Sequence, residues 1–224
     1  MKKEALLMMC LIVLTACKID VNGWDTNLLE ASDDIVTKTY KLSPFEEVKM
    51  RGVGNVELIQ SETKNGVVEL TAPDNYIELY KFESDGKRLD ISFAKKAINI
   101  HTKDVRIRVY VTDLIKLENS GAASISMASL DTDEIDVKNS GVGNITISGI
   151  ADNVELICSG VGSIHAGDLK ALNVNANVSG VGSIECYASE SIEGKVSGIG
   201  SLNYGGHPKH KNNKRTGVGS INEL

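Results

Sequence analysis

Residues 159–164 read Ser-Gly-Val-Gly-Ser-Ile, and close copies of this hexapeptide recur through the second half of the chain. The copies occupy residues 120–125, 140–145, 179–184, 197–202 and 216–221, and their first glycines lie 18 to 20 residues apart. A short motif that returns at a nearly fixed interval is the sequence signature of a repeat architecture. The second half of the chain is therefore predicted to be a stack of similar units.

Columns of apolar residues become visible when the copies are aligned on the first glycine. One apolar column stands four residues after that glycine. Others stand one residue after it and four and six residues before it, with mostly polar positions between. This alternation with period two indicates β-strands on both sides of the glycines, each with one buried face. We assign the core column, four residues after the first glycine, to Ile125, Ile145, Ile164, Ile184, Leu202 and Ile221.

The interval of about 19 residues is too short to hold a strand, a crossover helix and a return strand. Parallel neighbours must then be reached by coiling, so we predict an all-β fold, a parallel β-solenoid with coils ~4.8 Å apart. Each coil has two strands joined at the glycine motif, and a second turn that brings in an apolar residue such as Leu130, Ile150 or Leu169.

The glycines are predicted to form the corner between the two strands. A Cβ there would crowd the neighbouring coil or force an unfavourable φ, and the flanking Ser and Asn side chains can bind exposed backbone groups. The structural corners are assigned to Gly121, Gly141, Gly143, Gly160, Gly162, Gly180, Gly182, Gly198, Gly200, Gly217 and Gly219.

The chain divides into four segments by pattern. Lys2 and Lys3 precede an apolar run over residues 5–14, which is too short to span a bilayer and fits a secretory signal. Residues 14–17, Leu-Thr-Ala-Cys, resemble the bacterial lipobox, so we expect a signal peptide over 1–16 and lipidation of Cys17. Residues 17–34 would be a tether, 35–114 an irregular β-rich half that caps the stack, and 115–224 the repeat solenoid.

Two features support β-structure in the first half. Asp85-Gly86 between two β-like segments is a hairpin signal, and residues 105–111 alternate cleanly. An isolated copy of the motif, Arg-Gly-Val-Gly-Asn-Val, stands at residues 51–56. Beyond the signal, Cys158 and Cys186 fall on opposite sides of the corner and one coil apart, and we predict two free, buried thiols.

With these residues in view, the chain resembles the family called putative auto-transporter adhesin, head GIN domain. The repeated motif and the opening Phe-x-x-Val-x-x-x-Gly-Val-Gly over residues 45–54 carry the resemblance, which covers roughly residues 45–224. The resemblance implies a right-handed β-helix-like fold and a Bacteroidetes envelope protein at the cell surface or in the periplasm. It implies no catalytic residue.

The acidic groups are the candidates for an enzyme site, because glycoside hydrolysis needs two carboxylates across a sugar. They cluster near two turns, and Tyr187 is the only aromatic residue near either cluster. We interpret them as solvated charges. The clusters are Asp131, Asp133, Glu134 and Asp136, and then Glu185, Glu190 and Glu193.

Other ligand classes find little support in the sequence. The glycine motif leads into a strand and not a helix, which disfavours a phosphate loop, and it lacks the aspartate column of a calcium roll. His207 and His210 have no nearby Cys or carboxylate, so no metal site and no cofactor are expected. Residues 207–215 are interpreted as a basic, solvated loop; the alternative is a segment that contacts an acidic polymer or lipid headgroups. His165 is interpreted as outward-facing.

These patterns predict a non-catalytic outer-membrane lipoprotein of the cell envelope, an adhesin-like or scaffold module. Its partners would be the membrane, through the lipid, and an envelope glycan or protein; a net charge of −6 argues against nucleic acid. The alternatives are a glycan-processing β-helix lyase or hydrolase and an envelope-stress or signalling accessory. At the C-terminal end of the stack, we expect one of two arrangements: the loop 207–215 covers the last strand, or chains associate weakly end to end as homo-oligomers.

Overall fold

The computed structural model describes residues 28–93 and 99–224. Its first half contains β1 (Leu28–Leu29), β2 (Ile35–Lys41), β3 (Glu47–Met50), β4 (Val53–Gln60), β5 (Val67–Pro73), the 3₁₀ helix η1 (Asp74–Leu79), β6 (Tyr80–Ser84), β7 (Arg88–Phe93), β8 (Asn99–Ile100) and β9 (Arg106–Val111). The second half contains β10 (Lys116–Asn119), β11 (Ala122–Asn139), β12 (Ile145–Cys158), β13 (Ile164–Val178), β14 (Val181–Val196), β15 (Ile199–Gly205), β16 (His210–Arg215) and β17 (Val218–Glu223).

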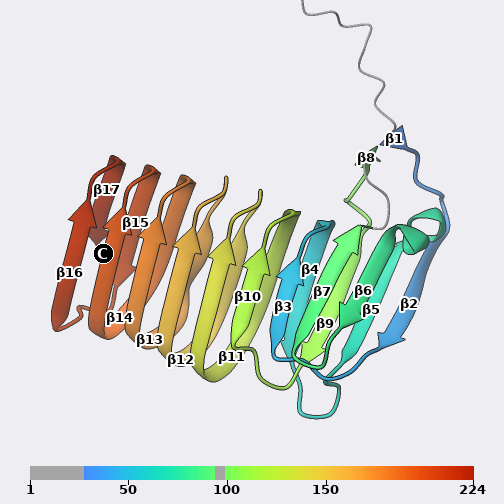
Figure 1. Ribbon diagram of the computed structural model, residues 1–224, viewed down its shortest axis with the longest axis horizontal. Helices are drawn as coiled ribbons and strands as arrows, with labels where there is room; N and C mark the ends of the chain where they lie inside the picture. The colour runs from blue at the N-terminus through green and yellow to red at the C-terminus, as the bar shows by residue number, and fades with distance from the viewer. Residues whose placement is uncertain (1–27, 94–98) are drawn as a thin grey trace, which may run out of the picture.

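The second half is a parallel β-solenoid of about five turns, as predicted (Figure 1). Each long strand, β11 to β14, bends once and pairs in parallel with the next along both of its arms. One ladder therefore runs through the strand segments before the glycine corners and ends at β16. The other runs through the segments after the corners and ends at β17.

The register places equivalent residues of successive coils directly side by side. Ile125, Ile145, Ile164, Ile184 and Leu202 pair in sequence and are at most 2% exposed. Ile221 closes the column and is half-buried, because it lies in the last coil with no neighbour beyond it. The aliphatic column is thus the continuous core of the stack.

The corners leave no room for a side chain. A Cβ on Gly141 would overlap the backbone oxygen of Gly121 in the preceding coil. Gly162 has a φ of +142° and a Cβ there would overlap the oxygen of Gly143, so both its conformation and its surroundings require glycine.

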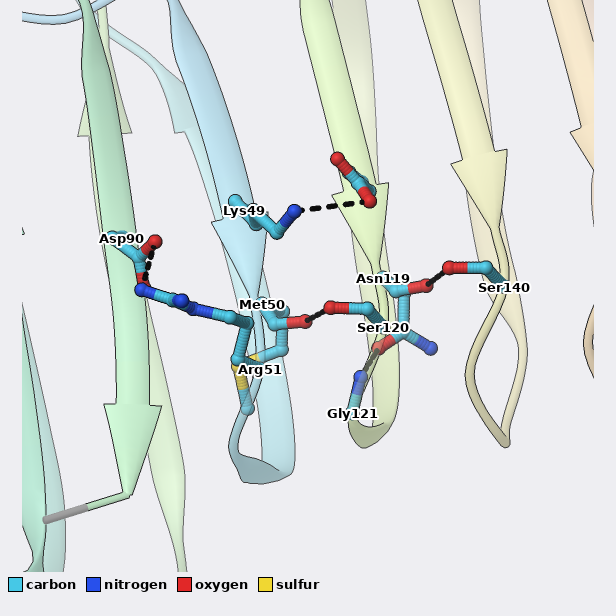
Figure 2. Close-up of polar contacts among 9 residues, drawn as sticks. Lys49, Met50, Arg51, Asp90, Asn119, Ser120, Gly121 and Ser140 are labelled. Atoms are coloured by element: carbon cyan, nitrogen blue, oxygen red, sulfur yellow. Dashed lines mark hydrogen bonds and ion pairs between the residues drawn. The ribbon is translucent and has the colours of Figure 1, made fainter.

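At two corners, the serine before the first glycine ties neighbouring coils together (Figure 2). The Ser120 hydroxyl donates to the Met50 carbonyl at 3.3 Å, and the Ser140 hydroxyl donates to the Asn119 carbonyl at 3.2 Å. Within the corner, the Gly121 amide donates to Asn119 Oδ1 at 3.2 Å. These bonds satisfy backbone groups where the ladder turns.

The second turn, at the opposite edge of the stack, is less regular than the corner. Leu130 and Leu169 are buried there, but Gly149 pairs with both of them and stands in their column. Ile150 follows one position later and is 54% exposed, so its assignment to the interior was wrong. Register shifts occur between Met127 and Leu130 and at the equivalent places in the next coils.

The isolated motif copy at residues 51–56 forms the first coil of the same stack. Its strands β3 and β4 pair in parallel with β10 and β11, and Val56 lies beside Ile125. The chain then leaves the stack after β4 and returns at β10. This long excursion places β9 beside β4 and β7 beside β3.

The excursion caps the stack, in agreement with the predicted β-rich first half (Figure 1). Asp85-Gly86 forms the predicted turn between the antiparallel strands β6 and β7, with Gly86 at φ +88°. On the other ladder, β5 pairs antiparallel with β9 and β2. Phe45, Tyr76 and Leu114 are among the large side chains that this part buries completely.

The signal peptide and Cys17 lie outside the described residues. Of the segment assigned to the tether, residues 28–34 are described and include β1, which pairs with β8. The Tyr76 hydroxyl donates to the Leu29 carbonyl at 2.5 Å, and Asn75 binds the Glu30 carbonyl. In the described residues, no helix is long and apolar enough to cross a membrane.

The two described cysteines lie in different columns. Cys158 is beside Asn139 and Val178, whereas Cys186 is beside Ala166 and Tyr204. Both are buried and free. Burial raises the pKa of the Cys186 thiol to about 12.

Candidate binding faces

Polar side chains of successive coils form rows on two outward faces, one on each side of the corners. The face before the corners carries amides and carboxylates, as in the row Glu134, Asn153, Asn173, Ser191 and His210. The face after the corners is rich in hydroxyls. Both faces repeat their hydrogen-bonding groups at the strand spacing of ~4.8 Å.

The face before the corners contains an open hollow of about 720 Å³. Two polar rows line it, separated by the inward-facing Val154, Val174 and Ile192. The second of these rows is Asp136, Glu155, Asn175, Glu193 and Asn212.

An amide ladder stiffens the floor of this hollow. Asn173 Nδ2 donates to Asn153 Oδ1 at 3.1 Å, and the Ser191 hydroxyl donates to Asn173 Oδ1 at 2.7 Å. Asn175 makes no such bond to another side chain among the described residues and is exposed. The hollow thus combines fixed amides with free amide and carboxylate groups, a set that can bind hydroxyl-rich or amide-bearing ligands.

The structure brings several of the predicted acidic candidates to this hollow but gives them no common partner. Glu134, Asp136 and Glu193 line it, and Asp136 neighbours Glu155 in the adjacent coil. Glu193 lies three strands from Asp136, ~14 Å along the ladder. Glu190 instead pairs with Lys209 at 2.8 Å, and Tyr187 lies under Lys170 at 4.1 Å. The residues that line the hollow include no aromatic side chain.

The face after the corners has a second, smaller hollow of about 560 Å³ where the solenoid meets its cap. Arg106 and Arg108 of β9 lie there with Ser124, Ser126 and Thr146. Arg108 Nε donates to Glu57 Oε2 at 3.0 Å. Farther along this face His165 is about half exposed and lies 3.9 Å from Glu185, consistent with its outward assignment.

The basic run differs from its prediction as a solvated loop. Residues 210–215 form β16, which pairs with β14 as the next coil, so this prediction was wrong. His207 also has a nearby carboxylate, Glu223 Oε1 at 3.3 Å, and Lys211 binds the same group at 2.7 Å. The hydrogen bond from Lys211 holds the pKa of Glu223 below its ordinary value.

Over residues 28–93 and 99–224, no three His, Cys, Asp or Glu side chains gather in a way that could hold a metal ion. The run 207–215 contributes the edge strand β16 and surface ion pairs with Glu190 and Glu223.

Two features of the corners were not predicted. Asn119 and Asn139 are completely buried in the core and bonded to each other at 3.0 Å. Asn139 Nδ2 also donates to the Gly143 carbonyl at 2.7 Å, which explains a polar residue inside an aliphatic stack. Conversely, the aliphatic column one residue after the corner glycine is exposed, as at Val161, which is 54% exposed.

Taken together, these features define a rigid parallel β-solenoid that displays repeated polar groups on two faces. The chain belongs to the family described as putative auto-transporter adhesin, head GIN domain, which matches residues 44–208. The adhesin family indicates a cell-envelope or surface protein. Comparison with curated proteins gave no match.

Solved structures of similar fold include proteins from Bacteroides and Parabacteroides species. A putative adhesin from Bacteroides fragilis aligns with a TM-score of 0.74 and 28% identity, over 88% of this chain and 100% of that one. A putative lipid binding protein from Parabacteroides distasonis aligns with a TM-score of 0.55 and 22% identity, over 88% and 99% of the two chains. The second likeness shows the fold alone.

Proposed function

We propose that this chain is a non-catalytic outer-membrane lipoprotein, anchored through Cys17, that binds an envelope glycan or protein on the face before its corners. The hollow on that face carries the proposal, because stacked coils hold its amides and carboxylates in fixed rows. The neighbour described as a putative adhesin supports a binding role. Membership of the adhesin family supports the cell-envelope location.

The preformed floor favours binding for a physical reason. Asn153, Asn173 and Ser191 are already hydrogen-bonded in a row, so a ligand would not have to order them. An extended polymer with repeating polar groups, such as a glycan, can contact several coils at once on a surface whose polar groups repeat every ~4.8 Å.

The binding proposal is tested on glycan and envelope-protein arrays probed with the full mature chain. Asn175→Arg places a long side chain in the hollow without removing any bond between described side chains, and we expect at least a tenfold loss of affinity. The matched control is Ser126→Arg on the other face, an exposed position whose hydroxyl makes no hydrogen bond to another described side chain. Equal binding by both variants to every ligand found would contradict the assignment of the hollow.

The anchor is tested separately by Cys17→Ala. Because several acyl chains on this cysteine would hold the protein to a bilayer, the variant should leave the membrane fraction. If it stays with membranes through detergent-free washes, the lipoprotein assignment is wrong.

A further inference from the structure

The corners of the solenoid carry a continuous line of exposed aliphatic side chains, which we call the corner ridge. Its members each follow the first corner glycine, and each is more than half exposed. Backbone pairing joins each to the next, so the line is ~19 Å long. The corner ridge consists of Val142, Val161, Val181, Ile199 and Val218.

The surroundings of the corner ridge are uncharged. From the residue before the first glycine to the core column, all five corners contain only Ser, Thr, Gly, Asn and aliphatic residues, in a chain with 24% charged residues. The nearest row on the face before the corners instead carries Lys138, Lys195 and Lys214, all exposed, and no acidic residue in these five coils. An apolar line with a basic margin matches the interface of a bilayer that contains anionic lipid.

The shape of the corner ridge disfavours a second copy of the chain as its occupant. A stable protein interface buries about 800 Å² on each partner, whereas this line is one side chain wide. Neither of the two hollows described above is lined by a residue of the corner ridge. A fluid surface can close around a narrow projecting line without a matching pocket.

The path of the chain brings this same edge toward the membrane. In Figure 1 the corners form the upper edge of the stack, and β1, where the described chain begins, lies beyond that edge. Eleven residue steps separate Leu28 from Cys17, a reach of at most ~40 Å. A lipid at Cys17 can therefore hold the corner edge close to the bilayer.

From these observations we infer that the solenoid lies with its corner ridge in the lipid headgroup layer, which leaves the polar faces beside it open to ligand. This orientation rests on the proposed lipid anchor. It assigns a role to an apolar line that the core does not use and that water would otherwise surround.

The test uses the lipidated mature protein on vesicles of neutral and anionic phospholipid. An environment-sensitive fluorophore is attached at Val161→Cys or at Ile150→Cys. Both positions are 54% exposed, but Ile150 lies on the opposite turn. The native Cys158 and Cys186 are buried and should label slowly. We expect a blue-shifted emission at position 161, quenched at least twofold more by nitroxide-bearing lipid than emission at position 150.

The outcomes separate the two proposals. Protein that floats with the vesicles but gives equal, water-like emission at both sites would overturn the ridge orientation and leave the anchor intact. Protein that does not float would overturn both. A blue shift at position 161 that grows with protein concentration without vesicles would overturn the lipid assignment in favour of a second copy.

Discussion

Replacing Ile164 by aspartate tests the register of the whole stack. Ile164 is fully buried between Ile145 and Ile184 in the core column. The change removes about 1.5–3 kcal/mol of hydrophobic stabilisation, and a carboxyl buried without a partner costs about 1–3 kcal/mol more, even when it is protonated. A total near 4 kcal/mol lowers the Tm of a domain of this size by about 8–16 °C.

The next residue supplies the control. His165 points outward and is about half exposed, with Glu185 as its neighbour. His165→Asp puts two exposed carboxylates side by side, which costs about 1 kcal/mol or less and shifts the Tm by no more than about 2–4 °C. Ile164→Ala, at about 2–5 kcal/mol, tests the same burial without adding a polar group if the aspartate variant fails to fold.

Thermal unfolding of the three variants, followed by circular dichroism, decides the matter. Equal Tm values for Ile164→Asp and His165→Asp would refute the period-two register, because only that register buries one of these adjacent residues and exposes the other.

Three further predictions concern the corners, a buried thiol and the free edge. A side chain at a left-handed φ costs ~1–2 kcal/mol. Gly162→Ala should lower the free energy of unfolding by well over that amount, because its Cβ would also overlap the preceding coil. Burial raises the pKa of Cys186 from 9.0 to about 12, so the unfolded chain loses its proton first and stability should fall above pH 9, by up to ~1.4 kcal/mol per pH unit. Lys211→Thr with Lys214→Thr should raise the oligomer fraction in light scattering, because lysines on an edge strand oppose pairing.

Each of these has an internal control. Gly86→Ala has only the conformational cost, since its φ is +88° and nothing lies within 4 Å of the added Cβ. An equal loss of stability in Gly86→Ala and Gly162→Ala would argue against crowding at the corner. Cys186→Ala should flatten the alkaline slope, and an unchanged slope would assign it to other groups. Lys138→Thr with Lys195→Thr, on strands paired on both sides, should leave the oligomer fraction unchanged.

The core of the solenoid could be predicted because its side chains repeat. The same buried positions recur in every coil, so single substitutions such as Ala176 or Gly194 do not hide a column. The family resemblance followed from the same motif. The first coil was harder to place, because its neighbour along the stack lies beyond the long excursion from β5 to β9.

The glycine corners could be predicted, but two of their features could not, because period two does not continue through them. The second glycine turns the chain, so Val161 and Ile164 face opposite ways although both are aliphatic. The buried Asn139 could not be predicted either, since its amide is satisfied by Asn119 of the neighbouring coil and by a carbonyl that the corner turns inward. The hollow could not be predicted either, because its rows of side chains are brought together only by the register between coils.

The contrast between the tight corner and the irregular second turn has a genetic consequence. The corner glycines are 18 to 20 residues apart, yet their columns stay aligned, because bulges near Leu130, Gly149 and Leu169 absorb the extra residues. Codons can thus be gained or lost at one edge without disturbing the other. In-frame duplication of a whole unit would lengthen both faces by one strand spacing and leave every existing corner unchanged.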